Sequence, residues 1–166
     1  PTILERYEDM GVDIIFAAEK KCWPDIKLIP DFPVSSTPYK YLNSGGYIGK
    51  VSALKEFLSE AVPDDSDDQL WIQKRFLSSP WQSMAFANLD YEGYIFQCDD
   101  DIEIINGQLA NGMCCPCIYH GNGGDDAKIR FKNLADKFGY VEEAEVLSPT
   151  YHNGLDYEEV APEILV

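Results

Sequence analysis

The chain has 166 residues, 45% of them hydrophobic, which is enough to bury one core of ordinary domain size. Its 29 acidic residues outnumber its 13 basic residues and give a formal net charge of −16, which argues strongly against a nucleic-acid partner because a phosphate backbone would be repelled. No window approaches the roughly 18 consecutive apolar residues of a membrane-spanning helix, and the first residues lack a signal-peptide pattern. We expect one domain with an acidic surface and no membrane span.

Hydrophobic periodicity predicts alternating helices and strands, an arrangement typical of α/β domains. Four prolines between residues 20 and 38 indicate a long irregular loop, and Ser66 is expected to cap the helix that follows it. Residues 141–166 hold few apolar anchors and many acids, which predicts an acidic, extended or poorly ordered extension to a domain formed by residues 1–140. The helices are predicted at residues 3–10, 52–58, 66–77 and 128–138, and the strands at 12–18, 39–49, 85–89, 94–97 and 113–119.

Residues 41–49 depart from the pattern of a buried strand because three glycines and one asparagine interrupt an apolar, aromatic run. Gly45 and Gly46 lack the Cβ atoms that would block a ligand. Asn43, next to Ser44, offers both a carbonyl acceptor and an amide donor, which suits a polyhydroxylated partner such as a sugar. A β-bulge or a tight turn would explain the same glycines.

An acidic run, Asp64-Asp65-Ser66-Asp67-Asp68, precedes the predicted helix at residues 66–77. Aspartates near a helix N-terminus stabilise the helix dipole, so capping and solvation explain this run as well as a binding role does. Gln69 follows at a position where one face of the helix would be buried.

A glycine-rich loop, His120-Gly121-Asn122-Gly123-Gly124, links a predicted strand to a predicted helix. This geometry presents backbone N–H groups to an anion, and a diphosphate is the obvious candidate. Lys128 would add a positive charge, and the His120 imidazole could bind a divalent cation held by the same phosphates.

The five cysteines are an odd number, so at least one thiol must be free. Cys114 and Cys117 have the spacing of zinc ligands, but no second cysteine pair or histidine pair follows them. Buried thiols or one local disulfide are the favoured interpretation.

The order of these motifs resembles that of nucleotide-sugar glycosyltransferases of the A-type, Rossmann-like fold, with a mixed sheet flanked by helices. The chain is more closely similar to the glycosyltransferase domain of procollagen lysyl hydroxylases over about residues 1–140. The matching motifs are Phe16-Ala17-Ala18-Glu19, Cys22-Trp23-Pro24-Asp25, Tyr41 to Gly49, Asp67-Asp68-Gln69-Leu70, Ile95-Phe96-Gln97 and His120-Gly121-Asn122-Gly123.

The resemblance implies metal-dependent transfer of glucose or galactose from a UDP-sugar to hydroxylysine or galactosyl-hydroxylysine of collagen-like chains, with Mn²⁺ bridging the diphosphate. It implies the lumen of the endoplasmic reticulum or another secretory compartment, and association with a hydroxylase domain or a second copy of the chain. The implied roles are metal binding for His120, donor binding for Asn43, Ser44, Gly45, Gly46, Gln69, Asn122, Gly123 and Lys128, and catalysis for Glu19, Trp23, Asp67 and Asp68.

The sequence departs from the family pattern in three places. Two extra residues lie between His120 and Lys128, and Ser66 breaks the family's poly-aspartate run. The family also carries an Asp-x-x-Asp metal motif on a strand before the first helix, so we expect the chain to be the C-terminal part of a catalytic domain that lacks its N-terminal nucleotide-binding portion.

Three other functions are compatible with parts of the sequence to different degrees. A catalytically silent domain that binds collagen-like chains or mediates assembly would share the same fold. A glycoside hydrolase is disfavoured because Asp67 and Asp68 are adjacent on a helix and diverge. The iron site of a hydroxylase needs a His-x-Asp motif and a distant histidine, and His120 and His152, the two histidines of the chain, do not supply that arrangement.

Overall fold

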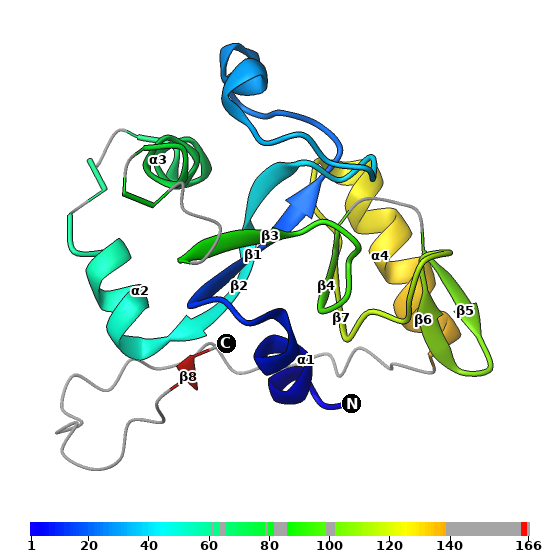
Figure 1. Cartoon of the computed structure of the whole chain (residues 1–166). Coiled ribbons are helices and arrows are strands. Elements are labelled where there is room, and N and C mark those ends of the chain that lie inside the picture. The colour runs from blue at the N-terminus through cyan, green and yellow to red at the C-terminus, as the bar shows by residue number, and fades with distance from the viewer. Residues whose placement is uncertain are drawn as a thin grey trace, which may run out of the picture.

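The computed structural model describes residues 1–60, 62–63, 66–78, 80–81, 86–98, 102–138 and 164–165. At the centre of this part of the chain lies a four-stranded sheet with the strand order β3-β1-β2-β8 (Figure 1). β1 runs parallel to β3 and antiparallel to β2, and β2 runs antiparallel to β8, so the predicted mixed sheet is confirmed. The strands span Ile14–Glu19 (β1), Tyr41–Lys50 (β2), Ala87–Asp90 (β3) and Ile164–Leu165 (β8).

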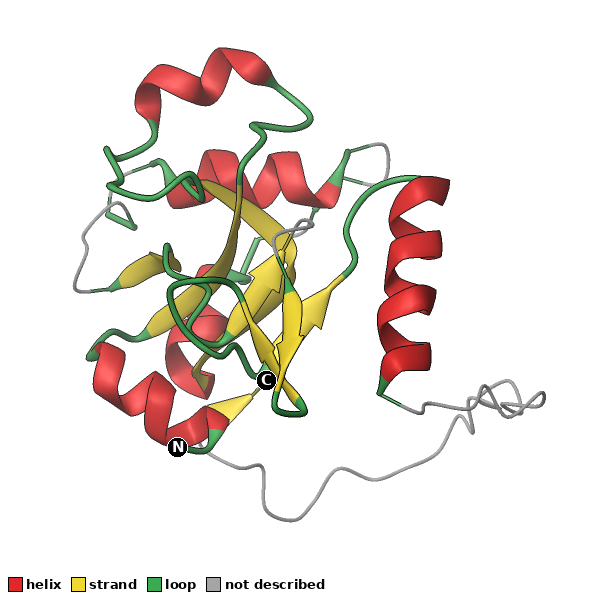
Figure 2. Ribbon diagram, turned by 90° about the vertical axis from the view of Figure 1, so that its right-hand side faces the viewer, coloured by secondary structure: helices red, strands yellow, loops and turns green. Residues whose placement is uncertain are grey.

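Helices lie on both sides of this sheet, as Figure 2 shows from a second direction. The first helix begins with a capping box, in which the Thr2 side chain accepts from the Glu5 N–H and the Glu5 carboxylate accepts from the Thr2 N–H. The α-helices span Ile3–Met10 (α1), Val51–Phe57 (α2), Asp68–Phe76 (α3) and Asp125–Lys137 (α4), and a 3-10 helix at Ile26–Asp31 lies within the proline-rich loop.

The helix starts differ from the predictions at two places. Asp67, not Ser66, caps α3, because its carboxylate accepts from the Leu70 N–H at 2.9 Å. α4 begins at Asp125, three residues before the predicted start, because Asp125 and Asp126 suit a first helical turn.

Two small sheets complete the described structure. Phe96–Cys98 (β4) pairs in parallel with Ile118–His120 (β7), whereas Glu103–Ile105 (β5) pairs with Gln108–Ala110 (β6) in an antiparallel hairpin. The predictions missed this hairpin, although Asn106-Gly107 carries its signal: both residues have positive φ, at 53° and 77°, as a two-residue hairpin turn of type I′ requires.

The core lies on both faces of β1, whose six residues are all buried. Ile14, Phe16 and Ala18 pack in the cluster that includes α2 and α3 side chains, while Ile15 and Ala17 pack with Tyr7 of α1 and with residues of β4. Period-two alternation along a strand places these two sets on opposite faces. This burial continues to the last residue of β1, so that Glu19 is only 5% exposed.

The β1–β2 pairing contains a bulge. Phe16 pairs with Tyr47 and Ala17 pairs with Asn43, so residues 44–46 have no partner in β1. The β-bulge, one of the alternative explanations of the glycines in the sequence, is therefore present.

All five cysteines are free thiols, so the local disulfide considered from the sequence is not formed. Cys22 and Cys98 are buried, as expected of structural thiols, whereas Cys115 is exposed. Within the described ranges, no three or more histidine, cysteine, aspartate or glutamate side chains are grouped so as to hold a metal ion.

Among the residues that the structure covers, no helix is both long and apolar enough to cross a membrane. The predicted disorder of residues 141–166 falls outside the described residues, apart from Ile164–Leu165, which pairs with Gly49 and Lys50 of β2.

Candidate functional site

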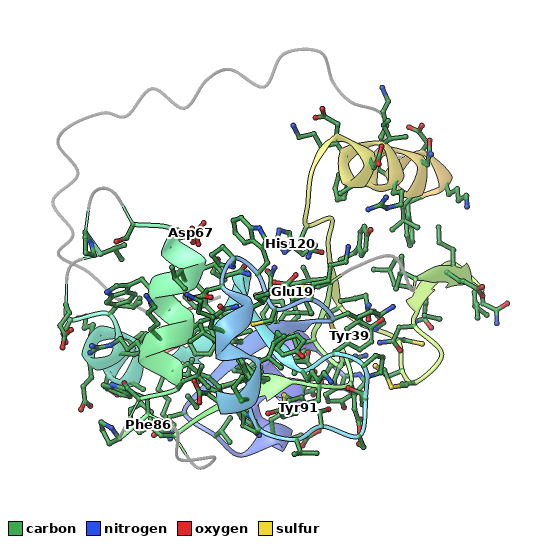
Figure 3. The ribbon with its side chains drawn as sticks, turned by 90° about the horizontal axis from the view of Figure 1, so that it is seen from above. Glu19, Tyr39, Asp67, Phe86, Tyr91 and His120 are labelled. Carbon is green, nitrogen blue, oxygen red and sulfur yellow. The ribbon has the colours of Figure 1, made fainter. Side chains whose placement is uncertain are left out.

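A cleft of about 960 Å³ lies where β1 and β7 end and where α4 begins. Ligands of open α/β sheets bind at such carboxyl ends of strands. Figure 3 looks onto this region, with Glu19, His120 and Asp67 labelled. Of the predicted site residues, the cleft is lined by Glu19, Trp23, Asn43, Gly45, Gln69, His120, Asn122 and Gly123.

Glu19 is the centre of a hydrogen-bond network in the cleft wall. Its Oε1 accepts from Gln69 Nε2 at 2.7 Å and from Asn43 Nδ2 at 3.2 Å, and its Oε2 accepts from Asn122 Nδ2 at 3.0 Å. Asn43 and Gln69 are buried like Glu19 itself. The network therefore joins β1, β2, α3 and the loop after β7 at one carboxylate.

Two glutamines of α3 hold the backbone of the loop that carries Trp23. Gln69 Nε2 and Gln73 Nε2 donate to the Trp23 carbonyl oxygen at 2.8 and 3.0 Å. Gln73 also donates to the Leu42 carbonyl oxygen at 2.8 Å. The Trp23 side chain is 56% exposed in the cleft wall, so the network fixes its backbone and leaves the indole accessible.

Asp67 and Asp68, predicted as catalytic, do not line the cleft. Asp67 caps α3, and the Asp68 carboxylate accepts from the Ser44 hydroxyl at 3.0 Å. Ser44 N–H donates to Gln69 Oε1 at 3.1 Å, so the bulge of β2 is attached to the start of α3. Both aspartates thus have hydrogen-bond partners within the protein, while Asp64 and Asp65 lie outside the described residues.

Gly45 and Gly46 were predicted to leave room for a ligand. In the structure, side chains of the protein itself occupy the space beside them. A Cβ atom at Gly45 would lie 2.5 Å from His120 Nδ1 and 2.7 Å from Nε2, and a Cβ atom at Gly46 would lie 2.8 Å from the Phe96 ring. Both glycines are therefore needed for packing, and Gly46 does not line the cleft.

His120 lies at the end of β7 with its ring over Gly45. Its Nδ1 is 3.0 Å from Asn43 Oδ1 and 3.9 Å from the Cys98 sulfur. Burial lowers the pKa of His120 below its ordinary value of 6.5, because the charged imidazolium is less well solvated there. The neutral imidazole, which can bind a metal ion, is thereby favoured near neutral pH.

The positively charged residues that line the cleft do not include Lys128, the one predicted from the sequence. Lys128 is exposed, does not line the cleft, and pairs with Asp125 at 3.3 Å. Lys21 and Arg130 line the cleft instead, as does Asp125. Residues two apart on a helix point about 200° apart, so Lys128 and Arg130 occupy opposite sides of α4. The Asp125-Asp126 helix start was the signal that could have identified Arg130.

His120 is the only predicted metal ligand, and its environment suits one coordination bond to a divalent cation. A neutral imidazole is a good ligand for such ions, and the hydrogen bond at Nδ1 fixes the ring orientation. Within the described residues His120 does not belong to a group of three or more metal-binding side chains, and the resemblance implies an Asp-x-x-Asp motif before the first helix.

The mixed sheet and the amide-lined cleft at its strand ends define an α/β domain with a candidate ligand site. The family model described as the PLOD GT domain matches residues 1–145. The chain belongs to this family of glycosyltransferase domains, which confirms the resemblance found in the sequence.

Relatives carry the same domain within longer proteins. A procollagen-lysine,2-oxoglutarate 5-dioxygenase of Drosophila melanogaster is 35% identical over 134 residues, which cover 73% of this chain and 19% of that protein. An uncharacterized protein of Acanthamoeba polyphaga mimivirus is 33% identical over 129 residues, covering 73% and 27%. The human multifunctional procollagen lysine hydroxylase and glycosyltransferase LH3 is 32% identical over 146 residues, covering 78% and 19%. The chain thus spans about a fifth to a quarter of these relatives.

Proposed function

We propose that this chain forms the donor-binding part of a UDP-sugar-dependent glycosyltransferase that transfers glucose or galactose to hydroxylysine or galactosyl-hydroxylysine of collagen-like chains. The observation that carries the proposal is the convergence of His120, Asn43, Gln69 and Asn122 around Glu19 in one cleft, although they come from separate segments of the sequence. Membership of the PLOD GT domain family supports the reaction type.

In this proposal the diphosphate of the donor lies at the start of α4. Gly123 has a φ of 116°, and the turn it makes lets the backbone approach an anion closely. Asn122 supplies a nearby amide, and Lys21 and Arg130 supply cations, of which the planar guanidinium of Arg130 suits phosphate oxygens. Arg130 thus takes the role that the sequence had given to Lys128.

The donor sugar would lie between the diphosphate and Trp23. Sugar hydroxyls would pair with the Asn122 amide, and the exposed Trp23 indole provides a flat apolar face for the sugar ring. Asn43, whose amide is engaged by Glu19, Gly45 and His120, would act on the site through His120. Gln69 and Ser44 act on this site by holding the Trp23 loop and the β2 bulge in place. Gly45 allows His120 to reach the same site.

A Mn²⁺ ion bound through His120 would neutralise the charge that grows on the UDP leaving group. His120 contributes a neutral nitrogen ligand whose ring orientation is set before the ion binds. Collagen-like acceptors and a neighbouring hydroxylase domain complete the proposed setting, as the name of human LH3 suggests. The resemblance adds a secretory compartment.

The activity test uses the full-length protein. With Mn²⁺, UDP-glucose or UDP-galactose, and a hydroxylysine-containing collagen-like peptide, we expect UDP release and a matching mass increase of the peptide. His120→Ala should lower the rate by about 100-fold or more at fixed Mn²⁺ concentration, because it removes a metal ligand. His152→Ala, the same change beyond the residues matched by the family model, is the control. An unchanged rate in His120→Ala would contradict the metal role.

A catalytically silent binding domain is the second candidate. It is favoured by one observation: Asp67 and Asp68, the predicted catalytic carboxylates, have structural partners and do not line the cleft. Calorimetric binding of UDP-sugar without product from either donor or any acceptor would support this alternative.

A further inference from the structure

Glu19 was expected to take part in catalysis, but its hydrogen bonds indicate a different task. Side-chain amides from Asn43, Gln69 and Asn122 donate to its two oxygens at 2.7–3.2 Å, and the residue is 5% exposed. The two oxygens of Glu19 accept all three hydrogen bonds, so each of these amides turns its nitrogen toward Glu19. The carboxylate thus sets the orientation of the amides that surround it.

The orientation of Asn43 is fixed at both ends of its amide group. Its Nδ2 donates to Glu19 Oε1, and its Oδ1 accepts from the Gly45 backbone N–H at 2.9 Å. A backbone N–H can only donate, and the Glu19 oxygen is an acceptor. Exchanging the oxygen and nitrogen of Asn43 would break both hydrogen bonds, so the assignment does not rest on one partner alone.

The proton on His120 follows from this orientation. The Asn43 Oδ1 atom lies 3.0 Å from His120 Nδ1 and can only accept. His120 Nδ1 must therefore carry the hydrogen, and in the neutral ring the lone pair then resides on Nε2. Glu19 and the Gly45 N–H orient Asn43, and Asn43 in turn sets which nitrogen of His120 can bind a metal ion or accept a proton.

We propose that Glu19 is a positioning residue that acts through Asn43 to hold His120 as the Nδ1–H tautomer and so keeps Nε2 available as an electron-pair donor. Binding of a divalent cation at Nε2 rests on the proposed function, whereas the tautomer does not depend on it. Outer partners that orient a metal-bound histidine typically change metal affinity 10- to 100-fold when they are removed.

The direct test is the long-range ¹H–¹⁵N spectrum of the histidine-labelled, metal-free chain above the pKa of His120. The chain has two histidines, so a His152→Gln sample assigns the signals. We expect a protonated, pyrrole-type Nδ1 and an unprotonated, pyridine-type Nε2 for His120. A protonated Nε2 would overturn the proposal without bearing on sugar transfer.

A variant tests the role of Glu19 itself. Glu19→Gln keeps the size of the side chain but replaces one acceptor oxygen with a donor, so Asn43 is oriented by the Gly45 N–H alone. The Nδ1–H tautomer of His120 should then be less dominant, with a measurable share of the other tautomer. The Mn²⁺ affinity of the full-length protein, measured by water-proton relaxation, should fall about 10- to 100-fold. Glu60→Gln, the same change at an exposed ion pair with Arg75, is the matched control.

The outcomes separate the two proposals. An unchanged tautomer and an unchanged Mn²⁺ affinity in Glu19→Gln would overturn the positioning role. If Glu19→Gln does not fold, as judged by circular dichroism, the wild-type spectrum still decides the tautomer. Absence of Mn²⁺ binding by the wild-type protein together with an Nδ1–H tautomer would contradict the metal-dependent function and leave the inference about Glu19 and Asn43 standing.

Discussion

Arg130 shows how much a single side chain's direction matters at this site. Arg130 lines the cleft and Lys128, two positions earlier on α4, does not. If UDP binds at the start of α4, Arg130→Gln should weaken UDP binding by about tenfold or more, because a charge-assisted hydrogen bond to phosphate is lost. Lys128→Gln should leave the affinity nearly unchanged. Calorimetric titration with UDP and Mn²⁺ measures both, and equal losses in the two variants would contradict the assignment.

The lowered pKa of His120 predicts how folding stability depends on pH. Since the folded pKa lies below 6.5, the unfolded chain binds more protons than the folded chain between these two values. The contribution of His120 to stability is therefore fully present above pH 6.5 and is lost as pH falls through the folded pKa. Urea unfolding of wild type and His120→Gln from about pH 5 to about pH 8 should show a difference that narrows on acidification. If the difference in unfolding free energy between the two proteins stayed constant with pH, the lowered pKa of His120 would be contradicted.

The sequence identified several residues of the cleft but not their side-chain contacts. His120, Asn43, Gln69 and Asn122 were singled out by motif order and meet in one cleft. The partner of Asp68 and the packing of Gly45 against His120 depend on side-chain contacts between segments far apart in the chain. No local pattern contains that information.

At the scale of elements, the helix α3 holds one wall of the cleft in place through its hydrogen bonds. Its first turn is fixed by the Asp67 cap, and its Gln69 and Gln73 hold Glu19 and the Trp23 loop. The start of α3 therefore affects both stability and the site.

Loss of the α3 cap gives a measurable prediction. Asp67→Ala should lower the free energy of unfolding by about 1 kcal/mol, because the Leu70 N–H loses its acceptor. Asp67→Asn keeps a side-chain oxygen at this position and should cost less, and Ser66→Ala should have little effect. Chemical denaturation of the three variants provides the test, and a larger effect at Ser66 than at Asp67 would restore the original sequence prediction.

The elements that were predicted well are those with strong local periodicity. The first helix was predicted at its observed bounds, and the central strands were predicted within a few residues of their observed ends. The β5–β6 hairpin was missed because its strands are only three residues long and alternate weakly, which leaves the Asn106-Gly107 turn as the main signal.

At the scale of the whole molecule, composition and periodicity predicted an α/β domain with a mixed sheet, and the structure and the family match support this class. Strand order was not predictable in the same way, because pairing of β1 with both β2 and β3 joins segments separated by dozens of residues. The resemblance supplied the functional hypothesis, and the geometry then redistributed roles among its residues. In the proposals above, Glu19 is a positioning group, and Arg130, which lines the cleft, takes the phosphate contact that the resemblance implies for Lys128.

The bulge of β2 has a consequence for how sequences of this kind can vary in length. Ser44 attaches to α3, Gly45 receives His120 and Gly46 receives Phe96, so each bulge residue meets a different part of the protein. Removing one of them would shift β2 by one position and turn its buried side chains to the opposite face of the sheet. The loop after His120, by contrast, carries two additional residues relative to the family pattern and still leads into α4. Insertions and deletions should therefore accumulate in the loop between His120 and α4, while the bulge of β2 keeps a constant length.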